Sequence, residues 1–165
     1  MYIALLLAIS FSTFSLDDKI NLGMTESELV EATSAVKVGS AGARSHSYTE
    51  FSEENPVVYI DRTSEKKKEY YFHDGKLYKV MTIYRNRVND QSYYLEKINT
   101  LTKQFGEPSR KYTDQVVTLV VLHSVWENEQ EELDLRFGAG YVYEVVTHKS
   151  MRKEKTKQDL HLNAI

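Results

Sequence analysis

Histidine and acidic side chains are the residues of this chain that could bind a metal ion or move a proton. The five histidines show no metal-ligand spacing, and none lies beside a nucleophile motif. They are His46, His73, His123, His148 and His161. Carboxylates between residues 127 and 134 could serve as acid, base or calcium ligand, but they surround an expected turn between strands, so we interpret them as a solvated hairpin loop. They are Glu127, Glu129, Glu131, Glu132 and Asp134. We therefore predict no catalytic residue, no metal ion and no cofactor, and we expect a protein that is not an enzyme.

Tyrosine is unusually frequent, with 12 tyrosines among 165 residues. In the segment 77–84, the two-residue period of a strand predicts two faces. One face receives Tyr78, Val80, Thr82 and Tyr84, and the other receives Leu77, Lys79, Met81 and Ile83. Aromatic rings with polar tips are typical of protein interfaces, but tyrosine also suits half-buried strands by propensity alone, and both interpretations stay open. The candidate partner-binding residues are Tyr71, Tyr78, Tyr84, Tyr141 and Tyr143.

In the first half of the chain, one helix and one hairpin would position these side chains. Thr25 stands three residues before Glu28, which is the pattern of a capping box, and it predicts a helix from about 26 to 36. A short strand is expected at 57–60. The dipeptide Asp74-Gly75 lies between two strand-like runs, 69–73 and 76–84, and predicts a hairpin with a type I′ turn.

The second half repeats the order of a helix followed by strands. Apolar residues at helical spacing predict a helix over 91–105, closed by Gly106 and Pro108. Strands are expected at 116–126, 132–137 and 141–148. We therefore predict an α+β fold with helices packed on one face of an antiparallel sheet, in which two tandem halves, 20–88 and 89–149, would each hold a helix and a meander.

The start of the chain indicates its compartment. Residues 3–9 form an uncharged apolar run that is too short to cross a membrane, and the small residues Thr13 and Ser15 suit a cut after Ser15. We predict a signal peptide at 1–15, a single domain at 16–149 and a charged C-terminal tail at 150–165. Because no Lys or Arg precedes the apolar run, a buried N-terminal element of a cytosolic domain stays the alternative. The expected location is the bacterial periplasm or the exterior, with no integral membrane segment after cleavage.

Charge and cysteine content limit the partners. The net charge of -3 and the pI near 6.0 argue against nucleic acid. The absence of cysteine excludes disulfides, thiol nucleophiles and the lipid-anchored cysteine of a lipoprotein. Basic residues between 148 and 157 could touch an anionic envelope surface, although a solvated tail is the simpler interpretation.

Short motifs in three places resemble a known family. Residues 20–29 read I-x-x-G-M-T-x-x-x-L, which resembles the opening of the helix in BamE-like and β-lactamase-inhibitor-like domains. Phe105-Gly106-Glu107-Pro108 matches the family's closing turn after the second helix, and Asp74-Gly75-Lys76-Leu77 resembles its hairpin. The chain departs from the family by lacking cysteine and the closing turn after the first helix.

The resemblance implies a protein-binding or envelope-assembly module rather than an enzyme. Together with the tyrosine pattern, it leads to the expectation of a non-enzymatic periplasmic or secreted domain that binds a protein partner through an aromatic sheet face. The alternative is a structural component of the cell envelope or of a surface or periplasmic appendage.

Overall fold

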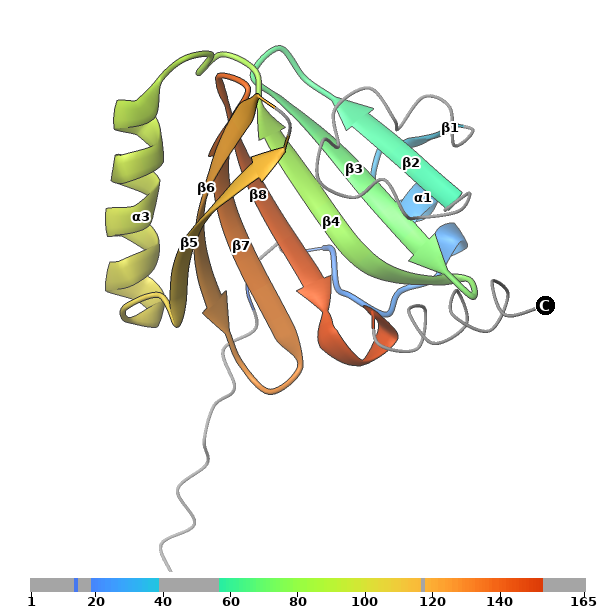
Figure 1. Ribbon diagram of the computed structural model, residues 1–165. Coiled ribbons are helices and arrows are strands. Elements are labelled where there is room, and N and C mark those ends of the chain that lie inside the picture. The colour runs from blue at the N-terminus through green and yellow to red at the C-terminus, as the bar shows by residue number, and fades with distance from the viewer. Residues whose placement is uncertain (1–13, 15–18, 39–56, 117, 153–165) are drawn as a thin grey trace, which may run out of the picture.

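One antiparallel sheet of eight strands forms the body of the protein (Figure 1). The structure is a computed structural model that describes residues 14, 19–38, 57–116 and 118–152. The helices are α1 (Glu26–Ala32) and α3 (Gln91–Phe105). The strands are β1 (Val36–Val38), β2 (Val57–Arg62), β3 (Lys66–His73), β4 (Lys76–Tyr84), β5 (Arg110–Val116), β6 (Leu119–Glu127), β7 (Glu131–Gly138) and β8 (Tyr141–His148).

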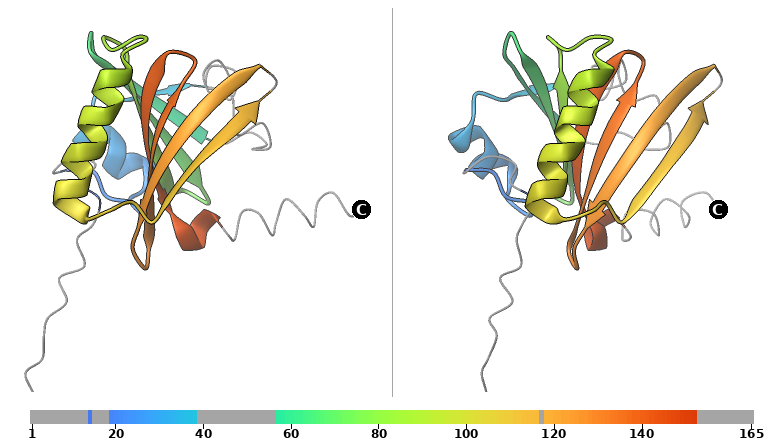
Figure 2. Two further views of the ribbon diagram at one scale, coloured as in Figure 1. Left: turned by 60° about the vertical axis from the view of Figure 1, so that its left-hand side comes forward. Right: turned by 90° about the vertical axis from the view of Figure 1, so that its left-hand side faces the viewer.

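The strand order in the sheet is β1-β2-β3-β4-β8-β7-β6-β5. Each of the two helices precedes four consecutive strands, and the last strands of the two runs, β4 and β8, pair with each other in the middle. Val80 of β4 lies opposite Val146 of β8 at this central pairing. All eight strands therefore belong to one continuous sheet, whose strong twist is visible in Figure 2.

The predicted α+β class is wrong. Strand accounts for 51% of the structure and helix for 23%, so the protein is a β-rich domain with few, short helices. The segments 20–88 and 89–149 each hold a helix followed by four strands, and the strands of both segments join in the single sheet. The prediction overestimated the helices and missed β1 and β5, because β1 is only three residues long and β5 carries no alternating apolar pattern.

Helices α1 and α3 contribute side chains to the same face of the sheet. Leu29 of α1 is buried with Tyr70, Leu77 and Val80. On α3, Tyr94 and Leu101 lie in a second apolar cluster, which also holds the following strand residues: Trp126, Leu133, Leu135, Val142 and Val146. Because the paired residues Val80 and Val146 link the two clusters, we call this side the helix face and the opposite side the far face.

The predicted capping box of the first helix and the predicted bounds of the second helix are confirmed. The Thr25 hydroxyl accepts from the Glu28 backbone N–H, and the Glu28 carboxylate accepts from the Thr25 N–H, which completes the capping box. Helix α1 ends at Ala32 rather than near residue 36, because residues 36–38 pair with β2. Helix α3 has the predicted bounds and ends at Gly106, whose φ is +83°.

The predicted hairpin at Asp74-Gly75 is confirmed, since the φ angles of the two residues are +48° and +71°. We expect Gly75→Val to lower the free energy of unfolding by about 1 kcal/mol or more, because a β-branched residue is strained at positive φ. Urea denaturation measures the loss. Gly75→Asn is the matched control, because asparagine tolerates this conformation and should lose much less. Equal stability of the two variants and the wild type would contradict the type I′ turn.

Several predicted segments lie outside the described residues. They include the signal peptide at 1–15 apart from Phe14, two of the histidines, His46 and His161, and the tail beyond residue 152. Residues 149–152, where the tail begins, are helical. None of the helices within the described ranges is long and apolar enough to cross a membrane.

Candidate functional site

The five candidate tyrosines do not form one exposed surface. Tyr71, Tyr78 and Tyr143 are buried in an apolar cluster on the far face, with Tyr141 packed against it and half-buried. The aliphatic members of this cluster are Val58, Ile60, Met81, Ile83 and Val145. Tyr84 lies on the helix face, where its ring contacts Tyr93 of α3 edge to face at 5.3 Å. The prediction that Tyr78 and Tyr84 share a face is therefore wrong.

A break in strand register explains the error. Tyr71 pairs with Lys79 but Phe72 pairs with Leu77, so Tyr78 is an extra residue on β4. Such a bulge turns the extra side chain to the same face as its neighbour. Tyr78 consequently joins the cluster of Met81 and Ile83, and the alternation beyond the bulge places Tyr84 on the other side.

Tyr84 is held by a charged pair beneath α3. Lys97 donates to the Tyr84 hydroxyl at 2.7 Å and to the Glu144 carboxylate at 2.9 Å, and the hydroxyl donates to the same carboxylate at 3.1 Å. Burial and the Glu144 charge raise the pKa of Tyr84 well above its ordinary value. This tyrosine therefore attaches α3 to the sheet.

The far face buries charge beside Tyr71. Glu69 accepts a hydrogen bond from the Tyr71 hydroxyl at 2.5 Å and forms an ion pair with Lys67, and both charged side chains are almost wholly buried. Lys79 places its ammonium 3.9 Å from the centre of the Tyr71 ring, in a cation–π contact. Lys67, Glu69, Tyr71 and Lys79 thus form a buried polar cluster that is held together by its own charges.

A second polar cluster lies on the far face of β5–β7. His123 is only 3% exposed, and its Nδ1 lies 3.0 Å from the Asp134 carboxylate, which also accepts from Arg136 Nε at 2.7 Å. The Tyr112 ring stacks on the imidazole, with ring centres 4.4 Å apart and planes 8° apart. Nε2 of His123 is buried without a hydrogen-bond partner among the described residues, 3.6 Å from an Asp114 oxygen.

The electrostatics of this second cluster favour ionised Asp134. Burial by itself would raise the pKa of Asp134, but the hydrogen bond with His123 and the positive charge of Arg136 hold that pKa below its ordinary value. A His–Asp pair is also part of a hydrolytic triad, which needs a nucleophile at the other ring nitrogen. At that position Nε2 of His123 faces the Asp114 carboxylate, so the described residues supply no nucleophile there. We call His123, Asp134, Arg136, Asp114 and Tyr112 the His123 cluster.

The Tyr112 side of the His123 cluster is accessible to solvent. Tyr112 is 42% exposed although its ring is held by the stacking contact. On the same face, Arg110 and Arg152 both bind the Glu132 carboxylate, at 2.6 and 3.1 Å. Strand β5 is the last strand of the sheet, and its residues 110–115 are exposed. An ordered aromatic ring flanked by charges of both signs can contact another protein.

Sequence reasoning missed this cluster. Asp134 and Glu131 were interpreted as part of a solvated loop, but both are buried, and Asp134 lies within β7. Asp134 lies between two leucines in its strand, which indicates only that its side chain faces the opposite side of the sheet from theirs. His123 and Asp134 meet because His123 lies opposite Arg136 in the β6–β7 register, diagonal to Asp134. The described residues contain no group of three or more histidines and carboxylates that could hold a metal ion.

The geometry defines a β-rich single-sheet domain with one charged aromatic surface at an edge strand. A family model described as the TP0088 domain matches residues 17–154, and the chain belongs to this family. No curated protein and no solved structure matches the chain. The family match does not connect the chain with BamE-like or inhibitor-like domains, so that resemblance stays a prediction.

Proposed function

We propose that this protein is a non-enzymatic protein-binding domain and that Tyr112 is the centre of its contact surface. The observation that supports the proposal is an aromatic ring that is 42% exposed yet fixed by stacking on a buried histidine. A side chain that is ordered before binding loses little conformational entropy in a complex. The proposed binding surface therefore differs from the one expected from the sequence. It lies on β5 and does not include Tyr71, Tyr78 and Tyr143, which are buried.

The position of β5 in the sheet supports the same proposal. No described strand lies beyond β5, and an edge strand of this length offers backbone groups to an extended segment of a partner. Arg110 and Asp114 flank Tyr112 on the same face with opposite charges, which favours a partner with complementary charges. Lys111 and its exposed neighbours would limit association with other copies.

The test places a photo-crosslinking phenylalanine analogue at position 112 and, as a matched control, at Leu95, an exposed residue of α3. We expect a discrete crosslinked protein at position 112 and none at 95. Against that protein, Tyr112→Ser should weaken binding about 30-fold, which corresponds to the ~2 kcal/mol of a typical hot spot. Equal crosslinking at both positions, or unchanged affinity of the folded Tyr112→Ser variant, would contradict the proposal.

We also propose a periplasmic or secreted location in a bacterium, which is supported by the apolar run at 3–9 and the small residues before position 16. N-terminal sequencing of protein isolated from the native host should find a start near Leu16. An intact Met1 in the soluble pool would exclude the signal peptide.

A structural role is the second candidate, and the edge strand β5 is the observation that favours it. If a neighbouring subunit of an envelope assembly or appendage covered β5 permanently, the same crosslink would appear in a stable complex of fixed stoichiometry. Size-exclusion chromatography of the crosslink-free complex separates the candidates. A complex that does not dissociate on dilution supports the structural role, and one that does supports reversible binding.

A further inference from the structure

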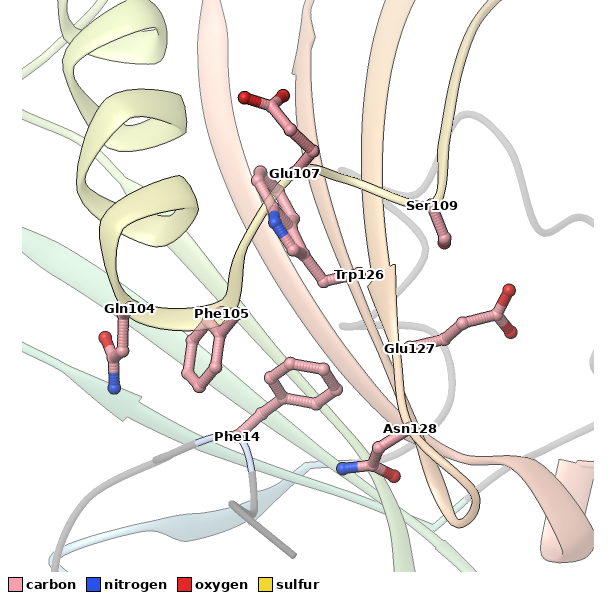
Figure 3. Close-up of a pocket in the computed structure, with 8 residues that line it drawn as sticks. All are labelled: Phe14, Gln104, Phe105, Glu107, Ser109, Trp126, Glu127 and Asn128. Carbon is pink, nitrogen blue, oxygen red and sulfur yellow. The ribbon is translucent and has the colours of Figure 1, made fainter.

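A cavity of about 220 Å³ lies on the helix side of the molecule, where α3 ends beside β6. We call it the aromatic recess, and Figure 3 shows the residues that line it. They are Phe14, Gln104, Phe105, Glu107, Ser109, Trp126, Glu127 and Asn128. The ring of Phe14 lies against that of Phe105, with the indole of Trp126 beside them, while the carboxylates of Glu107 and Glu127 point away from the rings (Figure 3).

Phe14 forms one wall of this recess although it lies far from the other lining residues in sequence. It is 5% exposed, and its ring meets the Phe105 ring edge to face, with centres 4.9 Å apart and planes at 77°. Its backbone N–H donates to the Glu131 carboxylate at 3.0 Å, across 117 residues of sequence. A single residue of the N-terminal segment is therefore held both by its ring and by its backbone.

The other walls of the aromatic recess are positioned by contacts that do not involve Phe14. The Trp126 indole N–H donates to the Gly106 carbonyl at 2.8 Å, which fixes the indole against the turn that closes α3. The Asn128 side chain accepts from the Glu131 backbone N–H at 2.7 Å and orders the loop that carries the acceptor. Glu131 is 8% exposed, and within the described ranges its carboxylate accepts the hydrogen bond from Phe14.

This combination of groups selects a particular kind of ligand. Ring edges and faces within the recess favour an aromatic side chain over an aliphatic one of similar size. A buried carboxylate requires a hydrogen-bond donor, and a backbone N–H next to that aromatic side chain supplies it. The matching ligand is an extended peptide segment that carries a phenylalanine.

We propose that the aromatic recess, together with the place that the Phe14 ring fills beside Phe105, is a peptide-binding site for a phenylalanine-bearing extended segment of a partner protein, and that Phe14 takes the place of that phenylalanine in cis. Phe14 lies on the N-terminal side of the cut expected after Ser15. This inference rests on the proposed signal peptide: cleavage after Ser15 would remove Phe14 and leave its place free for the phenylalanine of the partner. The site lies on the helix face, away from Tyr112, so the two binding proposals are tested independently of each other.

The test uses the full chain with Phe14→Ala and a synthetic peptide of residues 10–18. Trp126 is the single tryptophan, so its fluorescence reports on the recess directly. We expect the peptide to shift the Trp126 emission of the variant in a saturable way. The wild-type chain should bind at least tenfold more weakly, because the tethered Phe14 competes at a high effective concentration. The peptide with Phe14→Ala is the ligand control and should bind neither chain.

Two results would overturn the proposal: no binding of the peptide to the folded Phe14→Ala variant, or equal binding to the variant and the wild type. Circular dichroism and thermal melting establish that the variant is folded. If Phe14→Ala unfolds, Phe14→Leu replaces it, because leucine keeps most of the apolar volume but loses the edge-to-face ring contact. The peptide should then displace the more weakly held leucine side chain and bind at least threefold better than to wild type, and failure to do so counts against the site.

Discussion

Replacing Tyr78 by alanine is expected to lower the free energy of unfolding by about 3–5 kcal/mol, the loss typical of a large buried ring. Tyr78 is 1% exposed, and its ring lies in the far-face cluster with Val58, Met81 and Ile83. Truncation would leave a cavity that the surrounding strands cannot close. Urea denaturation with a two-state fit measures the change in stability.

Tyr112→Ala is the matched control for this measurement. Tyr112 is also a strand tyrosine of the far face, but it is largely exposed, so its truncation should cost about 1 kcal/mol or less. If Tyr78→Ala kept the wild-type midpoint and lost binding to a partner, Tyr78 would be an interface residue and its assignment to the core would be wrong.

Asp134→Asn is expected to destabilise the protein by about 3–5 kcal/mol, because breaking a buried ion pair leaves a charge without its partner. Asp134 is the common partner of His123 and Arg136, at 3.0 and 2.7 Å. Glu132→Gln is the matched control. Glu132 also binds two arginines, but Arg110 and Arg152 are both more than half exposed, and such pairs contribute about 1 kcal/mol or less.

The stability of the wild type and of Asp134→Asn should also depend differently on pH. Because the folded-state pKa of Asp134 is below its ordinary value of 3.8, the ionised carboxylate stabilises the fold fully above that pH. This contribution is lost as the pH falls through the lower, folded-state pKa. The stability gap between wild type and Asp134→Asn should therefore narrow below about pH 4. A gap that stays constant from pH 7 to pH 3 would show that ionised Asp134 does not contribute.

Local signals in the sequence predicted the local structure well. The Thr25–Glu28 capping box, the Asp74-Gly75 turn and the bounds of α3 each depend on residues that are neighbours in the chain. The last strand, 141–148, was also predicted with its correct bounds because it follows a glycine-rich turn and is rich in β-branched and aromatic residues. Strand β5 was missed because its side chains are polar and its pairing with β6 is all that makes it a strand.

The sequence alone could not predict the candidate sites, because they too depend on pairing between strands. The face on which Tyr78 lies depends on one extra residue opposite Tyr71, and a slip of one position moves every later side chain to the other face. His123, Asp134 and Tyr112 come together only through the registers of β5, β6 and β7.

By itself, then, the sequence determined where α1 and α3 begin, where the hairpin at Asp74-Gly75 turns and which residue types were available, since these follow from short-range sterics and hydrogen bonds. Only the tertiary structure decided that eight strands form one sheet, which tyrosines are buried and which is accessible. It also decided that Phe14 lies against Phe105 and Trp126. These outcomes depend on contacts between residues far apart in the chain, whose free energy is set by packing and burial rather than by any local pattern.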